Sequence, residues 1–170
     1  MAYVHEVGLV HRSTTELLRL SAAIVGELAR RDVVRTNDAP IGQYAEWLAE
    51  QILGGSRVTN SNPAIDIVGT NEFGNVQVKA RILRGGGMKD RQLSPFRSTT
   101  GPGYDFVLVL LFCSDFTVKR AVILSAGVVA GHGRHSAHVN GRIVRATDEF
   151  LSLGVDLTRR FNEFINADGS

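Results

Sequence analysis

Two short apolar segments in the middle of the chain carry the side chains best suited to chemistry. Asp66 lies within the apolar run 63–68, and Gln77 and Lys79 lie within the run 76–81. A carboxylate, an amide and an ammonium in such surroundings are costly to bury without partners, so they require a ligand or a charge network. Carboxylate and amide oxygens suit a divalent cation, and an ammonium suits a phosphate. Metal-assisted hydrolysis of a phosphodiester would use all three groups.

Each of these groups has a definite role in such a reaction. Asp66 would bind a hard cation, Mg²⁺ (or Mn²⁺), with the Gln77 side-chain oxygen and the Val78 carbonyl oxygen as further ligands. Lys79 comes two residues after Gln77, so an extended strand would place both on one face, with the ammonium near the attacking water or the scissile phosphate. Glu46, on a predicted helix, would add a second carboxylate beside Asp66.

Sequence patterns predict the helices and strands that would hold these groups in place. Helical periodicity, capping residues and Gly54-Gly55 mark the helices, and β-branched or continuously apolar runs mark the strands. In chain order we expect helices at 13–31 and 41–53, strands at 64–68, 75–82, 106–112 and 118–124, a short helix after Ser125, a small strand at 142–145 and a helix at 156–165. The glycine-rich segment 83–103 is predicted to be a long flexible loop.

Length and composition predict one globular domain over residues 1–170. The 170 residues are 44% hydrophobic, which is enough for one buried core and too little to argue for two. The apolar runs 106–112 and 118–124 are typical of central strands covered by helices on both faces. We therefore expect an α/β fold, with a mixed central sheet of about four to five strands flanked by helices.

The single cysteine and the absence of long apolar runs bear on the compartment. One cysteine, Cys113, excludes an intramolecular disulfide and a zinc site made only of cysteines. No run approaches the roughly 18 to 20 apolar residues of a membrane span, and the amino terminus lacks the pattern of a secretion signal. We expect a cytoplasmic protein that does not enter a membrane.

Positive charge is concentrated directly after the strand that carries Lys79. The chain as a whole has 19 Lys and Arg against 17 Asp and Glu, so its net charge of +2 does not by itself indicate a nucleic-acid ligand. Between Lys79 and Arg97, however, there are six basic residues and one acidic residue, Asp90. A loop of this kind is either simply solvated or grips a phosphate backbone. The candidate nucleic-acid contacts are Arg81, Arg84, Lys89, Arg91 and Arg97.

These residues resemble the signature of the PD-(D/E)XK, or restriction-endonuclease-like, nuclease superfamily. Its pattern is a carboxylate near the end of one strand, then an acidic residue, any residue and a lysine on the next strand, with a glutamate on a preceding helix. The matching residues are Asp66, Gln77, Lys79 and Glu46. Gln77 stands where the commonest form has Asp or Glu, which resembles the variant seen in methyl-directed restriction enzymes. Pro63 precedes Asp66 by three residues instead of adjoining it.

The resemblance spans roughly residues 41–124 and implies a restriction-endonuclease-like fold. It implies a Mg-dependent endonuclease that hydrolyses DNA, in a setting such as restriction or phage defence. A homodimer is the economical way to cut two strands, and the apolar first helix, 13–31, is a candidate interface. Because no base-reading module is visible, loops, a second subunit or a partner protein would supply sequence specificity.

Other interpretations of the same residues remain open. Asp66 and Lys79 would also fit a structural salt bridge across a hairpin. Glu46 would also fit a solvated helix position, as expected of Glu50 one turn later. The whole chain would then be a catalytically silent DNA-binding protein of the same fold, or a protein-interaction module such as a component of a defence complex or an immunity protein.

Two further patterns argue against other kinds of site. His132, His135 and His138 are three residues apart, which is not the spacing of a zinc-binding helix, so a loop or a partner contact is favoured over a metal site. The run Gly85-Gly86-Gly87 is not followed by Lys-Ser or Lys-Thr, which argues against a nucleotide-binding P-loop.

Overall fold

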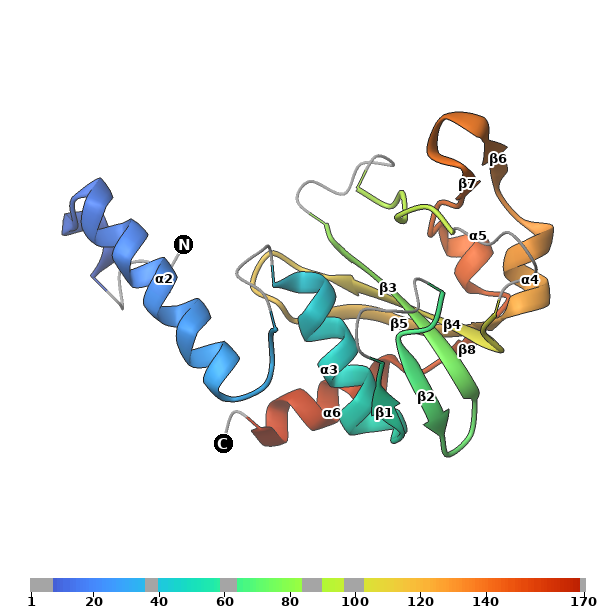
Figure 1. Cartoon of the computed structure of the whole chain (residues 1–170), viewed down its shortest axis with the longest axis horizontal. Coiled ribbons are helices and arrows are strands. Elements are labelled where there is room, and N and C mark those ends of the chain that lie inside the picture. The colour runs from blue at the N-terminus through green and yellow to red at the C-terminus, as the bar shows by residue number, and fades with distance from the viewer. Residues whose placement is uncertain (1–7, 36–39, 59–63, 84–89, 97–102, 169–170) are drawn as a thin grey trace.

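A six-stranded mixed sheet forms the centre of the computed structural model, which describes residues 8–35, 40–58, 64–83, 90–96 and 103–168 (Figure 1). In their order across the sheet, the strands are β1 (Ser56–Arg57), β2 (Ile67–Thr70), β3 (Gly74–Ile82), β4 (Phe106–Phe112), β5 (Val118–Ser125) and β8 (Val155–Asp156). β3 and β4 run parallel, and the other neighbouring pairs are antiparallel. The predicted class and the mixed sheet are confirmed. The expected strand number was too low, because the edge strands β1 and β8 have only two residues each and carry no pattern of their own.

Helices cover both faces of this sheet (Figure 1). The helices are η1 (Leu9–His11), α2 (Thr14–Arg30), α3 (Ile41–Leu53), α4 (Ala126–Gly131), α5 (Asp148–Leu151) and α6 (Thr158–Asp168). A separate hairpin joins β6 (Arg134–Ser136) to β7 (Gly141–Ile143) through η2 (Ala137–Val139). α3 and α6 pack on one face of the sheet, with Leu48 and Phe161 in the core, and α4 and α5 pack on the other, with Val129 and Phe150.

Local capping explains why the first two long helices begin and end where the sequence predicts. Ser13 accepts a hydrogen bond from the Glu16 amide, and the Glu16 side chain accepts one from the Ser13 amide, which forms a capping box at the start of α2. α3 ends at Gly54, whose φ of 75° lies in the left-handed region that favours glycine. The predicted helices 13–31 and 41–53 are therefore confirmed.

The two central strands are the best-buried part of the chain. All residues of 107–112 are 0% exposed, so both faces of β4 lie in the core. Leu108, Leu110 and Phe112 face α3 and α6, whereas Val107 and Val109 face α4 and α5. Among the described residues, no helix is both long and apolar enough to cross a lipid bilayer.

β2 begins three residues later than predicted, and this changes the setting of Asp66. The strand was expected at 64–68 but covers Ile67–Thr70, so Asp66 lies in a bend directly before it. The ladder between β2 and β3 pairs Ile67 with Val76 at this end. Asp66 therefore lies directly before the first residue pair of the β2–β3 ladder, and its side chain does not follow the strict alternation that a strand imposes.

Part of the segment predicted to be a flexible loop is packed structure instead. Within 83–103, the described residues 90–96 include Leu93 and Phe96, which are 1% and 6% exposed. The Phe96 amide donates to the Arg142 carbonyl, and the Leu93 amide donates to the Val144 carbonyl. This segment therefore covers one face of the sheet and ties β7 to it.

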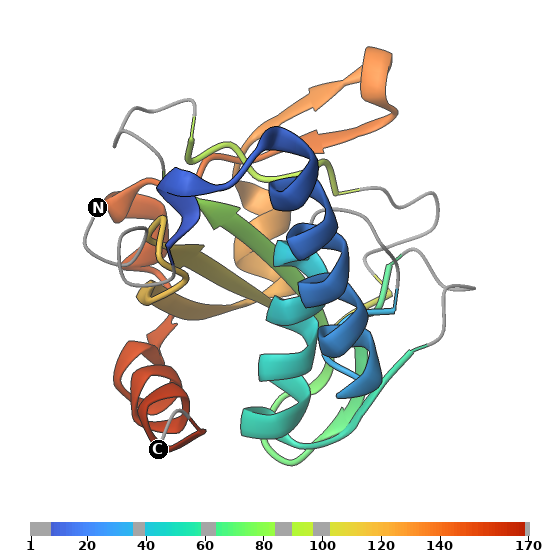
Figure 2. The same ribbon diagram turned by 90° about the vertical axis from the view of Figure 1, so that its left-hand side faces the viewer.

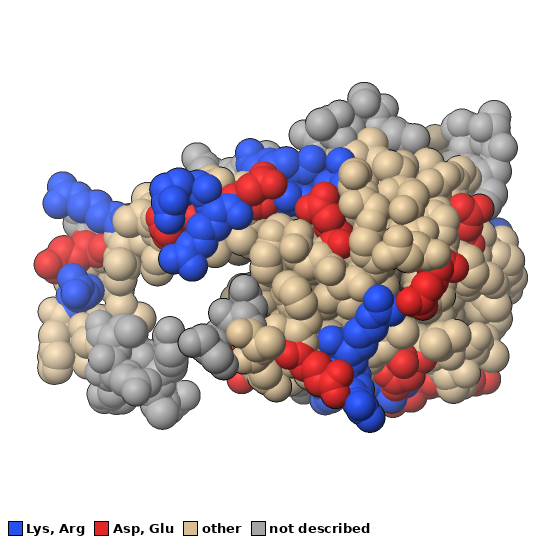
Figure 3. All heavy atoms as spheres, turned by 90° about the horizontal axis from the view of Figure 1, so that it is seen from below, with Lys and Arg blue, Asp and Glu red and all other residues tan. Residues whose placement is uncertain are grey.

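α2 extends away from the sheet at the amino-terminal end of the described chain (Figure 1). The space-filling view from below shows this arm separated from the body by a hollow, with acidic and basic side chains next to each other along it (Figure 3). Leu17 and Ile24 on α2 are 38% and 52% exposed. Its apolar residues are thus less covered than those of α3 or α6.

Candidate functional site

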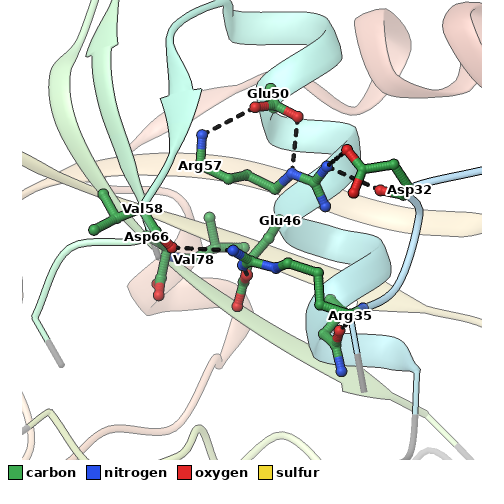
Figure 4. Close-up of polar contacts among 9 residues, drawn as sticks. Asp32, Arg35, Glu46, Glu50, Arg57, Val58, Asp66 and Val78 are labelled. Atoms are coloured by element: carbon green, nitrogen blue, oxygen red, sulfur yellow. Dashed lines mark hydrogen bonds and ion pairs between the residues drawn. The ribbon is translucent and has the colours of Figure 1, made fainter. Parts of the chain in front are cut away.

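Asp66 is fixed to the edge of β3 by its backbone and its side chain. Its amide donates to the Val76 carbonyl at 3.0 Å, and its carbonyl accepts from the Val58 amide at 2.9 Å. Its Oδ2 accepts the Val78 amide hydrogen bond at 2.7 Å, which replaces the strand partner that Val78 would otherwise have on this side (Figure 4). The carboxylate is thereby held in one orientation beside the middle of β3.

Val78 also turns its carbonyl toward Asp66. In an extended strand, the N–H and C=O of one residue point to the same side, and the sides alternate along the strand. The Val76 carbonyl accepts from Asp66 and the Val78 amide donates to Asp66, so both residues direct their backbone groups to the β2 side. The Val78 carbonyl oxygen, a predicted metal ligand, therefore lies on the same edge as the Asp66 carboxylate.

Glu46 reaches this place from α3. α3 packs on the sheet through Ala45, Leu48 and Ala49, each 0% exposed, and this packing directs Glu46 toward the β2–β3 edge. Figure 4 shows the Glu46 and Asp66 side chains extending into the same space. The Glu46 side chain is 23% exposed. The sequence prediction that a helix would bring Glu46 to Asp66 agrees with this arrangement.

Both carboxylates are harder to ionise than a solvated carboxyl group. Burial raises the pKa of Glu46 above its ordinary value, and the negative charge of Asp66 raises it further, whereas the Arg35 guanidinium lowers it. Burial also raises the pKa of Asp66, against the lowering effects of the Val78 amide, Lys79 and Arg35. A cation placed between the two carboxylates would relieve both costs.

Arg35 is the cation that the structure places at this pair. Its Nη2 donates to Glu46 Oε2 at 3.0 Å, and its Nη1 donates to the Val58 carbonyl at 3.2 Å. The Arg35 amide in turn donates to the side-chain oxygen of Gln43 on α3. Sequence analysis missed Arg35, because it lies outside any motif and eleven residues before Glu46. The only sequence signal is a basic residue close before a helix that carries a carboxylate.

Lys79 lies on the opposite face of β3 from α3, yet its charge reaches Asp66. The Lys79 ammonium lowers the pKa of Asp66, which places the two within electrostatic reach. Its Nζ sits 5.1 Å from the centroid of the Phe96 ring, in a cation–π arrangement. Phe96 is a second residue that sequence analysis missed, since it falls in the segment predicted to be flexible.

Gln77 shares the face of β3 that carries Lys79, as the alternation predicted. Gln77 pairs with Val107 and Lys79 with Val109 across the parallel ladder, and both valines belong to the core on that face. The Gln77 side chain is only 2% exposed, so its amide lies inside the protein. Glu46 therefore lies on the α3 side of the sheet, whereas Gln77 and Lys79 lie on the opposite side. Asp66 lies between them, at the edge of β3.

The donor atoms at this edge suit a hard cation. Two carboxylates and the Val78 carbonyl are oxygen donors, and Mg²⁺ is usually held by one or two carboxylates together with water. Among the described residues, no group of three or more His, Cys, Asp or Glu side chains is placed to hold a metal ion. Two carboxylates and one carbonyl oxygen would leave room for the water ligands that Mg²⁺ usually keeps.

A second ion-pair cluster lies one turn further along α3. Glu50 was expected to be a plain surface carboxylate, but it accepts from the Arg57 amide at 2.9 Å and from Arg57 Nε at 2.8 Å. Arg57 Nη2 also donates to Asp32 at 2.7 Å, and the Arg57 side chain is 6% exposed (Figure 4). The expectation for Glu50 was wrong, because β1 carries Arg57 over this helix.

The structure describes two of the five candidate nucleic-acid contacts, Arg81 and Arg91. Arg84, Lys89 and Arg97 lie outside the described residues. Arg81 lines an open cavity and donates from Nε to the Gln92 carbonyl at 2.6 Å. Arg91 has a structural role: its side chain is 16% exposed, pairs with Asp148 at 2.7 Å and donates to the Ala146 carbonyl at 3.0 Å.

The three histidines are spread over different elements. His132 ends α4, with Nδ1 at 2.7 Å from the Val128 carbonyl, whereas His135 lies on β6 and His138 on η2. Among the described residues, they do not belong to a group of three or more His, Cys, Asp or Glu side chains that could hold a metal ion.

The arrangement at the β3 edge brings oxygen donors and a positive charge close to one another. Asp66, Glu46 and the Val78 carbonyl supply oxygens, and Lys79 supplies a positive charge whose field reaches Asp66. No protein-family model matches the chain, and no curated protein sequence matches it. The chemistry of the site is therefore inferred from its geometry and charge.

Proposed function

We propose that this chain is a metal-dependent endonuclease that hydrolyses DNA phosphodiester bonds. The observation that carries the proposal is the approach of Glu46 to Asp66, two half-buried carboxylates from different elements whose pKa values are both raised. Such a pair is unfavourable for stability unless a cation compensates it. Sites of this kind are typical of function rather than of structural support.

The residues would divide the work as follows. Asp66, Glu46 and the Val78 carbonyl would hold the cation, which would supply charge stabilisation at the phosphate and a water of lowered pKa. Lys79 would face the phosphate or the attacking water, and the Phe96 ring limits the positions its ammonium can take. The hydrogen bond from the Val78 amide keeps the Asp66 carboxylate oriented before any ligand binds.

Gln77 fits this proposal as a neutral member of the site. A third carboxylate at this buried position would add a charge beside two groups that already resist ionisation. An amide oxygen still offers a ligand for the cation without that cost. Gln77→Glu would therefore exchange stability for stronger metal binding.

The proposal extends to the finer fold and to the partners. The order of α3, β2, β3 and β4, with β3 and β4 parallel, supports a restriction-endonuclease-like core. The exposed Leu17 and Ile24 of α2 support a homodimer through this arm. Size-exclusion chromatography with light scattering tests the dimer: Leu17→Glu/Ile24→Glu should yield a monomer, and an unchanged mass would contradict an α2 interface.

The nuclease proposal is tested with supercoiled plasmid and purified protein. Wild type should nick or linearise the plasmid with Mg²⁺ or Mn²⁺ and fail to do so in EDTA. Lys79→Met and Asp66→Asn should remove cleavage while circular dichroism shows an intact fold. Glu50→Gln is the control, because it alters a partly buried carboxylate that binds Arg57 and lies outside the proposed site. Equal cleavage by wild type and Lys79→Met, or none by wild type with any divalent metal, would sink the proposal.

A catalytically silent protein of the same fold is the second candidate. The observation that favours it is the Arg35–Glu46 ion pair, which already gives one carboxylate a positive partner. In this case Arg35 would be a structural replacement for the metal. The two candidates separate with Arg35→Gln: a nuclease should bind Mn²⁺ as well or better once the competing cation is gone, whereas a silent protein should only lose stability.

A further inference from the structure

A long stretch of the sequence outside the proposed catalytic site contains basic residues and no acidic residue. Residues 116–147 contain no Asp or Glu, although Asp115 and Asp148 adjoin the stretch on either side. The same stretch holds three of the five histidines. Its basic residues are Lys119, Arg120, Arg134, Arg142 and Arg145. The net charge of the whole chain is only +2, so the excess of positive charge in this stretch is local.

The β6–β7 hairpin presents part of this charge on a projecting ribbon. β6 and β7 pair antiparallel, with Arg134 opposite Ile143 and His135 opposite Arg142. Arg134 and His135 are exposed, and so is His138 in the turn. Figures 1 and 2 show the hairpin standing out from the body, next to α4 and α5. A two-stranded ribbon of this kind has the width that the major groove of B-DNA admits.

The base of the hairpin is joined to the candidate catalytic site. Arg142 and Phe96 exchange two backbone hydrogen bonds, at 2.9 and 3.0 Å. Gly141 approaches the Phe96 carbonyl so closely that a Cβ there would lie 2.8 Å from its oxygen. The Phe96 ring in turn lies 5.1 Å from Lys79 Nζ. One residue therefore connects the ribbon to the lysine that would face the phosphate.

Two adjoining cavities extend from the end of β3 to the hairpin. The first, of about 720 Å³, is lined by Arg81, Asp90, Gln92 and Arg145 among others. The second, of about 550 Å³, shares Gln92 and Arg145 with the first and adds Arg134. Three arginines thus line these two cavities, and Arg145 is common to both. By contrast, basic and acidic side chains are mixed on the face seen from below (Figure 3).

We propose that the β6–β7 hairpin and the two cavities at its base bind duplex DNA, with Arg134 and Arg145 on the phosphate backbone. The inference rests on the proposed function for its choice of DNA as the ligand, but it does not require cleavage. Arg134 and Arg145 are both exposed, which leaves their guanidinium groups accessible to a ligand. Arg142 supports the ribbon instead, because its Nη1 donates to the His132 and Gly133 carbonyls.

The test measures the binding of a short fluorescein-labelled DNA duplex by fluorescence anisotropy. EDTA is present so that no cleavage can occur. Arg134→Gln/Arg145→Gln is compared with Arg19→Gln/Arg159→Gln, which removes the same charge from α2 and α6. The hairpin variant should bind about tenfold more weakly near 100 mM KCl, and its slope of log K against log [KCl] should be shallower by about 2. The control variant should bind like wild type.

The outcomes distinguish this inference from the nuclease proposal. Equal weakening by both variants, preference for single strands or RNA, or no binding by wild type in EDTA would overturn the hairpin assignment. Selective weakening by the hairpin variant supports it, even if plasmid cleavage is never seen. Cleavage by wild type together with normal binding by the hairpin variant would leave the nuclease proposal standing and remove this one. Matched circular dichroism and thermal unfolding of both variants establish that they are folded.

Discussion

Glu46 and Glu50 lie one turn apart on α3, and their side chains are equally exposed, at 23%. Glu50 accepts two hydrogen bonds from Arg57, which is itself 6% exposed and held by Asp32 as well. Glu46 accepts one from Arg35 and lies beside Asp66, and its pKa is raised. The two side chains have the same exposed fraction but different partners.

The difference separates a carboxylate that supports the fold from one that is available for chemistry. Around Glu50, one guanidinium lies between two carboxylates, so the opposite charges attract one another and stabilise the cluster. Around Glu46, two carboxylates compete for the same positive charges, and both pay for partial burial. Proteins keep such unfavourable pairs where activity depends on them.

The largest expected effect is on plasmid cleavage. Asp66→Asn should lower the rate by about 100-fold or more, because the cation loses a charged ligand at the position where it acts. Glu50→Gln should change the rate by less than about threefold, since Glu50 contacts only Arg57 and the fold. Initial rates at saturating Mg²⁺ measure both. If the two variants lost activity equally, the distinction between the carboxylates would fail.

The second effect is on stability, and here the substitution of Glu50 should have a larger effect than that of Glu46. Glu50→Ala should lower the free energy of unfolding by about 3 kcal/mol, because it leaves the buried Arg57 guanidinium without a main partner. Glu46→Gln should cost less than about 1 kcal/mol, since it also removes a like charge from beside Asp66. Urea unfolding in EDTA compares the two. A larger loss for Glu46→Gln would show that Glu46 is the structural carboxylate.

The sequence was sufficient for features that local rules control. The capping box of Ser13 and Glu16 and the left-handed Gly54 mark helix ends through neighbours in the chain. The apolar run of β4 is legible because a strand buried on both faces needs no polar residues. Alternation along β3 likewise placed Gln77 and Lys79 on one face.

What escaped prediction depends on contacts between distant segments. The start of β2 is set by where its ladder with β3 ends, so the bend at Asp66 has no local signal. Arg35 and Phe96 become part of the site only through packing against α3 and β7. The role of Arg57 follows from pairing of a two-residue strand, which composition does not reveal.

A smaller effect is expected from metal binding in the absence of DNA. Mn²⁺ at ten times its dissociation constant should stabilise wild type by about 1.4 kcal/mol, which corresponds to a rise in Tm of about 3 to 5 °C. Glu50→Gln should have a lower Tm than wild type without metal, and Mn²⁺ should raise that Tm by the same amount. Asp66→Asn/Glu46→Gln should show none, because both carboxylate ligands are gone. A rise that survives in this double variant would place the cation elsewhere.

The smallest effect is a change of stability with pH. The folded protein raises the pKa of Glu46 and Asp66, so it binds more protons at this pair than the unfolded chain does. The contribution of the pair is therefore most favourable below the ordinary carboxyl pKa and is lost as pH rises through the raised values. The double variant Asp66→Asn/Glu46→Gln does not titrate here, and its side-chain amide oxygen at position 66 still accepts the Val78 hydrogen bond.

Measured in EDTA, the free energy of unfolding of wild type should thus fall relative to this double variant as the pH rises above the ordinary carboxyl pKa. Carboxylates with lowered pKa values, such as Asp148 beside Arg91 and Asp156 beside Thr158, give the opposite trend in both proteins and cancel in the difference. The same titration with Glu50→Gln should leave the fall in place, since Glu46 and Asp66 remain. A difference that rises with pH would mean that Arg35 and Lys79 outweigh burial and that the pair is a salt-bridge cluster like that of Glu50.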